Sequence, residues 1–194
     1  MEFRDVLARR RMVRRHLPDP IDPALLDRIV SAGQRAPSAG NTRGQEFVVV
    51  TQPEGRRRIA ELAGETDYVA RGFEPWLSTA PALVVLCTSE DAYRRRYAEP
   101  DKGVSVDADW PVPWWWVDTG ASLMAILLAA VDAGLSAGFL GAHAVPGLHT
   151  ELALPAEVTP VGVITLGRPA TDRRSSSLGR PKRDDVIHHE RWQG

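Results

Sequence analysis

Ala82-Leu83-Val84-Val85-Leu86-Cys87-Thr88 is apolar almost throughout, and a short run of this kind predicts a strand buried on both faces of a sheet. Phe47–Thr51 has the same character and predicts a second strand buried on both faces. Ser136–Leu140 and Val158–Leu166 predict two more strands, the last of which ends at Gly167-Arg168-Pro169. A sheet of at least these strands therefore forms the centre of the predicted fold.

Helices separate these strands along the chain. Asp22-Pro23 provides a cap and a proline at the first helical position, and the helix that follows should stop before Pro37. Further helices are predicted at Arg56–Leu62 and Glu90–Tyr97. Val117–Asp132 is apolar on nearly every face, which predicts a helix buried all round. Strands that alternate with helices indicate an α/β or α+β sandwich.

Size and composition indicate a soluble protein of one domain. The chain has 194 residues, which suits a single core that a second copy of the chain could complete. A formal net charge of −1 argues against a dedicated nucleic-acid binder. Cys87 is the only cysteine and reads as a small buried apolar residue, which fits a reducing cytoplasm. We see no secretory signal, and the apolar stretch Ala121–Val131 is too short to span a bilayer.

The first fifteen residues carry six arginines, at positions 4, 9, 10, 11, 14 and 15. About one helix later comes the turn Pro37-Ser38-Ala39-Gly40-Asn41. Guanidinium groups match phosphate geometry and remain charged, so the two segments together suggest an anion cradle and a polar turn for a phosphorylated cofactor. A solvated basic helix or an arm for nucleic acid is the alternative.

Two segments do not fit a compact core. Pro100–Trp116 contains four tryptophans, at positions 110, 114, 115 and 116, and it predicts an irregular loop that covers a ligand or a partner surface. Thr171–Gly194 is polar and basic, yet it ends in apolar residues such as Trp192, which suggests docking against something. These segments and the apolar helix point to a homodimer with a ligand at the seam.

Four segments, in order and spacing, resemble the FMN-dependent nitroreductase family: Arg10–Arg14, Ala36–Asn41, Gly120–Gly141 and Pro160–Pro169. The resemblance implies an α+β fold, a three-layer sandwich whose central, mostly antiparallel sheet is flanked by helices, in a domain-swapped homodimer. It also implies one FMN-binding domain at residues 1–170 and an arm at residues 171–194 that wraps the partner subunit.

The resemblance also implies which residues contact the flavin. The family's arginine motif holds the FMN phosphate and the pyrimidine edge, and it maps onto Arg10, Arg11, Met12 and Arg14. The family's usual serine is Met12 here, so only a backbone contact can survive at that position. The turn that lies along the flavin ring maps onto Pro37, Ser38, Ala39 and Asn41. The strand end that points at flavin N5 maps onto Gly141 and Ala142, and the basic residue that closes on the phosphate maps onto Arg180.

The substrate side departs from the family pattern. Where the family continues with glutamine, proline and tryptophan, this chain has Arg43-Gly44-Gln45. We expect Arg43, Trp114 and Trp115 to line the substrate pocket, with packing of the dimer core as the alternative for the tryptophans. The histidines show no spacing typical of a metal site, and we expect no bound metal.

The implied activity is that of an FMN-dependent oxidoreductase, which passes hydride from NAD(P)H through flavin N5 to nitroaromatic or quinone-like acceptors by a ping-pong mechanism. No catalytic side chain is expected, because the flavin performs the redox step. Arg14 would stabilise negative charge on the reduced ring, and the Ala142 amide would donate to N5. Two alternatives are a flavin-sequestering protein of the same fold without NAD(P)H activity and a specialised oxidase or dehalogenase. The expected partners are a second copy of the chain and a small-molecule substrate, with no nucleic acid and no membrane.

Overall fold

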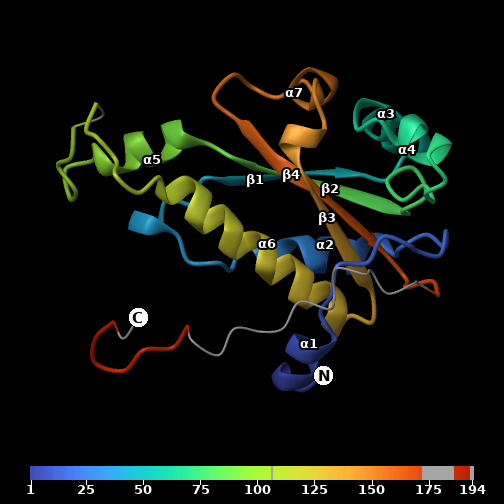
Figure 1. Cartoon of the computed structure of the whole chain (residues 1–194). Helices are drawn as coiled ribbons and strands as arrows, with labels where there is room; N and C mark the ends of the chain where they lie inside the picture. The colour runs from blue at the N-terminus through green and yellow to red at the C-terminus, as the bar shows by residue number, and fades with distance from the viewer. Residues whose placement is uncertain (106, 172–185, 193–194) are drawn as a thin grey trace.

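A computed structural model describes residues 1–105, 107–171 and 186–192. Its centre is a four-stranded sheet with the order β1-β2-β4-β3, in which every neighbouring pair is antiparallel (Figure 1). The strands are β1 (Gln45–Val50), β2 (Ala82–Thr88), β3 (Ser136–Gly141) and β4 (Thr159–Gly167). The four strands predicted from the sequence are confirmed, and their ends shift by at most two residues.

β2 lies between β1 and β4, and all its side chains are buried, as predicted. Its pairing places Val84 between Val49 of β1 and Ile164 of β4. Because side chains alternate between the two faces of a strand, a fully buried β2 requires a covering layer on each side of the sheet.

β1 was predicted to be buried on both faces, and this prediction is wrong. Glu46 and Val49 are exposed, and the other side chains of the strand are only partly buried. The physical reason is position, because β1 is an edge strand that pairs with β2 alone. Phe47 packs against the core on one face of the sheet, and Val48 and Val50 pack against the core on the other.

One face of the sheet is covered by α2 (Pro23–Gly33) and α6 (Trp114–Asp132), which cross it side by side (Figure 1). The Asp22 carboxylate accepts a hydrogen bond from the Leu25 amide at 2.9 Å, which confirms the predicted cap of α2. α2, β1 and α6 approach one another closely at Gly33 of α2, where a Cβ atom would lie 2.9 Å from the Phe47 ring of β1. The core of this layer consists of apolar side chains of α2, α6 and the sheet, among them Leu26, Ile29, Val84, Ile126 and Ile164.

α6 differs from its prediction in two ways. The helix begins at Trp114, so three of the four tryptophans assigned to a loop lie in its first turn. It is also not buried all round, since Trp116, Val117 and Met124 are exposed, because the sheet and α2 cover only one side of it. The helix is long and apolar enough to cross a membrane, but it packs against α2 and the strands as the core helix of a soluble domain does.

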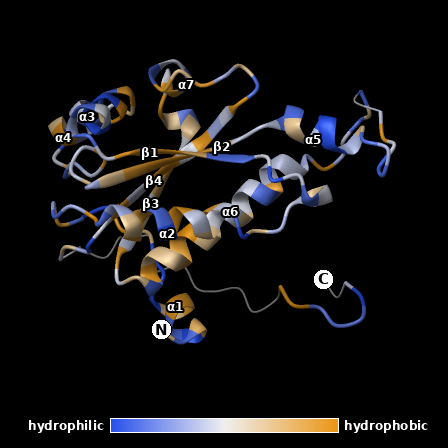
Figure 2. Cartoon of the chain, turned by 180° about the vertical axis from the view of Figure 1, so that it is seen from behind, coloured by the Kyte–Doolittle hydropathy of each residue, from blue (hydrophilic) through white to orange (hydrophobic). Residues whose placement is uncertain are grey.

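The opposite face of the sheet is covered by three short helices, α3 (Pro53–Leu62), α4 (Glu65–Ala70) and α7 (Leu148–Glu151) (Figure 1). Apolar residues of these helices meet the second face of β2 and β4 in a separate core. Figure 2 shows the apolar strands between the two helical layers. The predicted α+β three-layer sandwich with an antiparallel central sheet is therefore confirmed within one chain. The predicted helix at Glu90–Tyr97 is also present as α5, and α1 (Phe3–Arg9) lies beside α6.

The buried position of Cys87 yields a direct prediction. Burial, reinforced by the negative charge of Glu46, raises the pKa of the Cys87 thiol to about 12. Ellman's reagent at pH 8 should therefore leave the native protein unlabelled and release one equivalent of thiolate after denaturation in guanidinium chloride. Rapid labelling of the native protein would show that the core between the sheet and α3, α4 and α7, which contains Cys87, is open to solvent.

Candidate functional site

Residues Arg10–Arg15, which follow α1 and are called the arginine-rich segment below, lie along the outer edge of β3. Met12 forms a parallel bridge with Ala137, and the Val13 amide donates a hydrogen bond to the Ala137 carbonyl at 2.9 Å. The close approach depends on Gly138, because a Cβ atom there would lie 2.5 Å from the Val13 carbonyl oxygen. The segment is thereby fixed on the sheet, with Val13 buried and Met12 and Arg14 exposed.

The segment is anchored at its far end by a buried histidine. His16 lies beneath the surface, with Nδ1 3.1 Å from the Ser136 hydroxyl and Nε2 3.0 Å from the Thr165 hydroxyl. Buried polar atoms of this kind are satisfied by hydrogen bonds, so His16 has a structural explanation. The ring holds the arginine-rich segment to both β3 and β4.

The charges of the segment are largely uncompensated. Among the residues that the structure describes, none forms an ion pair with Arg10, Arg11 or Arg14, whereas Arg15 pairs with Glu74 at 3.3 Å. The Arg14 guanidinium instead lies over the Trp76 ring, 5.3 Å from its centroid. Guanidinium groups without a carboxylate partner leave the positive potential available to an anionic ligand.

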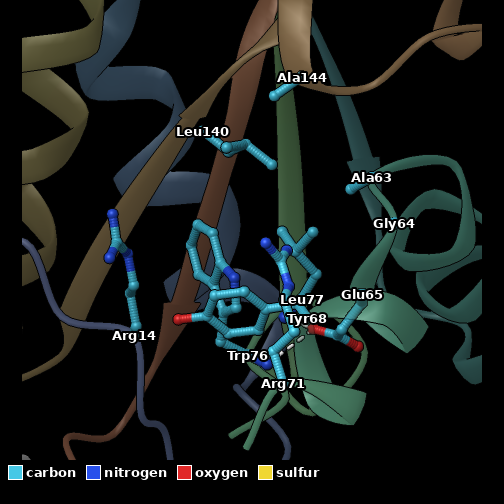
Figure 3. Close-up of a pocket in the computed structure, with 10 residues that line it drawn as sticks. All are labelled: Arg14, Ala63, Gly64, Glu65, Tyr68, Arg71, Trp76, Leu77, Leu140 and Ala144. Atoms are coloured by element: carbon cyan, nitrogen blue, oxygen red, sulfur yellow. Dashed lines mark hydrogen bonds between the residues drawn. The ribbon is translucent and has the colours of Figure 1, made fainter. Parts of the chain in front are cut away.

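Arg14 borders a cavity of about 180 Å³ between the arginine-rich segment, α4 and the end of β3. Figure 3 shows Arg14 on one side and the Tyr68 and Trp76 rings in the middle of the group, with Leu140 and Ala144 beyond them. The lining residues are Arg14, Ala63, Gly64, Glu65, Tyr68, Arg71, Trp76, Leu77, Leu140 and Ala144. Flat aromatic and aliphatic surfaces beside a guanidinium suit a planar ligand that carries negative charge.

The Trp76 wall is held by a buried carboxylate. One Glu65 oxygen accepts hydrogen bonds from the Trp76 amide at 2.7 Å and from the Leu77 amide at 2.6 Å, and the other accepts from the Ser78 amide at 3.2 Å. Charge-assisted bonds to three successive amides fix the backbone that carries the indole. Glu65, Tyr68 and Trp76 were not among the residues predicted for the site. Glu65 in particular has no signal in the sequence, because an acid at the start of a short helix is normally exposed to solvent.

The end of β3 supplies the backbone side of the cavity. β3 ends at Gly141, and Ala142–Ala144 form the short 3-10 helix η2, so the predicted contacts Gly141 and Ala142 lie between two cavity-lining residues. His143, next in the chain, is exposed, and its ring lies beside Gly141, where a Cβ atom would come within 2.8 Å of it. The structure thus brings the Arg14 side chain and the end of β3 to the same cavity.

The Pro37–Asn41 turn lies elsewhere. Ala39–Asn41 form a short 3-10 helix, η1, and the Ala39 amide donates to Asp118 of α6 at 2.7 Å. The Tyr93 hydroxyl donates to the same carboxylate at 2.8 Å, and burial together with this carboxylate raises the pKa of the Tyr93 phenol. The Ser38 hydroxyl accepts from the Arg43 amide at 2.9 Å, so Ser38 shapes the turn itself.

α6 separates the two groups of predicted contacts. Asp118, which holds the turn, lies near the start of the helix, and Ala137, which holds the arginine-rich segment, follows its end at Asp132. The helical rise between Asp118 and Asp132 is about 20 Å. Figure 1 shows the same separation, with α5 and the start of α6 at one end of the molecule and the end of β4, beside the start of β3, at the other. A single chain does not bring all the predicted contacts together.

The remaining predicted residues are distributed as follows. Trp115 is buried against Tyr93 and Trp110, whereas Trp114 is 41% exposed and free to contact a ligand. Arg43 lies beside the turn and lines a second cavity. Arg180 and most of the predicted arm at 171–194 lie outside the described residues. Within the described part of the chain, no group of three His, Cys, Asp or Glu side chains could hold a metal ion.

Comparisons with known proteins agree with this architecture. An FMN reductase [NAD(P)H] of Bacillus subtilis is 28% identical over 198 residues, which cover 94% of this chain and 71% of that protein. An iodotyrosine deiodinase of Nematostella vectensis is 24% identical over 206 residues, which cover 96% of this chain and 74% of that protein. The solved structure of the hypothetical oxidoreductase YcnD of Bacillus subtilis has a TM-score of 0.76 to this chain and is 26% identical in sequence, over 100% of this chain and 76% of that chain.

A family model described as "Nitroreductase family" matches residues 7–168, which is most of the chain. The match begins just before the arginine-rich segment and ends with the residue that follows β4, so it includes the turn and both cavities. The chain therefore belongs to the nitroreductase family.

Proposed function

We propose that the protein is an FMN-dependent oxidoreductase that takes hydride from NAD(P)H and passes it to nitroaromatic or quinone-like acceptors. The observation that carries the proposal is the cavity beside Arg14, where unpaired guanidinium charge, two aromatic rings and the end of β3 converge in a nitroreductase-family chain. FMN, when bound, supplies the hydride chemistry, and the protein binds and orients it.

The residues of the cavity fit a flavin in chemistry. In the proposal, Arg10, Arg11 and the Met12 backbone contact the phosphate side, and the Arg14 guanidinium stabilises negative charge on the pyrimidine edge. The Ala142 amide, at the start of η2, is the proposed donor to N5. Glu65 acts through Trp76, because it fixes the backbone of the residue over whose ring the Arg14 guanidinium lies.

The size of the cavity favours a site shared by two chains. Its 180 Å³ is smaller than the roughly 300–1,000 Å³ typical of complete small-molecule pockets. The Pro37, Ser38, Ala39 and Asn41 contacts lie too far away to complete it within one chain, so we propose that a second copy supplies them. The exposed face of α6, with Trp116, Val117 and Met124, is the proposed surface of that homodimer.

Further elements of the proposal concern the outer parts of the site. The segment 171–194 would wrap the partner subunit, with Arg180 closing on the phosphate. Arg43 and Trp114 would face the acceptor from the turn side, and Trp115 would support them from its buried position. The single cysteine, buried as a free thiol, suits a cytoplasmic enzyme.

An anaerobic titration of the FMN-loaded protein with NADPH and NADH tests the activity. The flavin absorbance near 450 nm should bleach on addition of the nucleotide and return when a quinone or nitroaromatic is added. A flavin that is bound but resists both nucleotides would instead support a sequestering protein. Bleaching that only a halogenated aromatic substrate reverses would support a dehalogenase.

Replacement of Arg14 by alanine should weaken FMN binding by about 10- to 100-fold, because a charged hydrogen bond typically contributes about 1.5–3 kcal/mol. The dissociation constant can be measured by quenching of FMN fluorescence. Arg4→Ala, which removes an exposed arginine of α1, is the matched control and should leave the constant unchanged. Equal affinity in the Arg14 variant and the wild type would remove Arg14 from the flavin site.

A heterodimer tests whether the site is shared. In a dimer of one Arg14→Ala chain and one Asn41→Ala chain, one shared site would retain both residues and the other would lack both. At an FMN concentration that loads neither homodimeric variant, the heterodimer should bind about half of the wild-type flavin. If each site belonged to one chain, the heterodimer would contain no intact site and would bind no more than its parents.

A further inference from the structure

A second cavity lies near the Pro37–Asn41 turn and belongs to neither the arginine-rich segment nor the end of β3. Its volume is about 460 Å³, and it is bounded by side chains from the end of α2, the loop after η1 and strand β1. The lining residues are Gln34, Arg35, Arg43, Gln45 and Phe47. The flavin contacts proposed above use none of them.

The cavity carries two positive charges and, among the described residues, no carboxylate lines it. Neither Arg35 nor Arg43 forms an ion pair within the described part of the chain. Two guanidinium groups that face one cavity repel each other, and an anionic ligand bound between them is attracted to both. The Gln34 and Gln45 amides add neutral hydrogen-bond donors on the same cavity wall.

Arg43 is fixed in place before any ligand binds. Its amide donates to the Ser38 hydroxyl at 2.9 Å, and its Nε donates to the Asn41 side-chain oxygen at 3.1 Å. Arg43 and Asn41 both adopt the left-handed conformation with φ of 55°, which asparagine tolerates and which is uncommon for arginine. Because Nε is already bonded, the terminal nitrogens remain available to an oxyanion.

The pleat of β1 keeps the acid of this strand, Glu46, on the other side of the sheet. Gln45 and Phe47 share the face that lines the cavity, and Glu46 between them projects from the opposite face. Glu46 pairs in register with Cys87, and its charge acts on the Cys87 thiol in the other core. The alternation therefore keeps the Glu46 charge out of the cavity.

We infer that this cavity binds the oxyanion of a substrate, a carboxylate or a phosphate, with Arg35 and Arg43 as the binding residues. A guanidinium fork holds either group through two parallel hydrogen bonds, and Phe47 offers a flat apolar surface to an attached ring. The inference rests on the proposed function, because it places the cavity beside the turn that completes a partner's flavin site. It assigns a substrate class to that site: acceptors or nucleotides that carry an anionic oxygen group.

The test compares an anionic acceptor with its neutral counterpart. The ratio of kcat/KM for 4-nitrobenzoate to kcat/KM for 4-nitrobenzamide should fall about tenfold in Arg35→Gln and in Arg43→Gln, because each variant loses a charged hydrogen bond. Arg43→Lys should restore part of the ratio, since it keeps the charge without the fork. Arg28→Gln, on the exposed side of α2 and outside the cavity, is the matched control and should keep the wild-type ratio.

A second comparison, of NADPH with NADH as the reductant, distinguishes an acceptor carboxylate from a nucleotide phosphate as the group that binds in the cavity. If the same variants lower the preference for NADPH over NADH and leave the nitrobenzoate ratio unchanged, the cavity binds the nucleotide phosphate. If neither ratio changes, the inference is overturned.

Calorimetry with benzoate and benzamide, which needs no turnover, separates this result from failure of the proposed function. Benzoate binding that is weakened about tenfold in Arg35→Gln would support the oxyanion site even in a protein that NAD(P)H does not reduce. Equal binding of benzoate by wild type and variant, in an enzyme that turns over neutral acceptors, would overturn the oxyanion site alone.

Discussion

The complete burial of β2 is the constraint on which the rest of the structure depends. A strand with no exposed side chain needs an apolar layer on each face, and α6 with α2 on one side and α3, α4 and α7 on the other provide them. The length of α6 then sets the distance between the two groups of predicted ligand contacts. The same helix that covers the sheet therefore prevents a single chain from assembling them, and its exposed side offers the surface by which a second chain could do so.

The elements of this architecture were predictable where local signals were strong. The Asp22-Pro23 start of α2 and the apolar run of β2 both appear as predicted, because capping and continuous burial leave clear patterns in one segment. The errors concern position in the fold. Whether β1 is central or at an edge depends on its neighbours, and whether α6 is covered on its second side depends on what packs there, so neither can be read from local composition.

The residues of the candidate site also fall into two groups, those with a local signal in the sequence and those without one. The arginine-rich segment and the turn could be proposed as ligand contacts because arginine clusters and turns that contain proline and glycine are recognisable in the sequence. The wall of the first cavity was not, because Glu65 acts through hydrogen bonds to amides eleven to thirteen residues away, and Trp76 reaches Arg14 only in the folded chain. The second cavity likewise joins Arg35 to Gln45 across a loop. Residues that act by long-range contact carry no local signature.

The positive charge of the two cavities depends on which arginines form ion pairs elsewhere in the molecule. The chain has 24 Lys and Arg against 25 Asp and Glu, so its overall charge predicts no anion site. The acids, however, pair with arginines along the exposed sides of α3 and α5, as in the pairs of Arg57 with Glu54 and of Arg94 with Glu90. Such exposed pairs contribute little stability. Their effect is to neutralise the surfaces of α3 and α5, whereas Arg10, Arg11 and Arg14 on one side of α6 and Arg35 and Arg43 on the other form no ion pair within the described part of the chain. A protein of near-zero net charge thereby presents two local positive surfaces, and an acceptor with an anionic group would be attracted to both ends of a site shared between two chains.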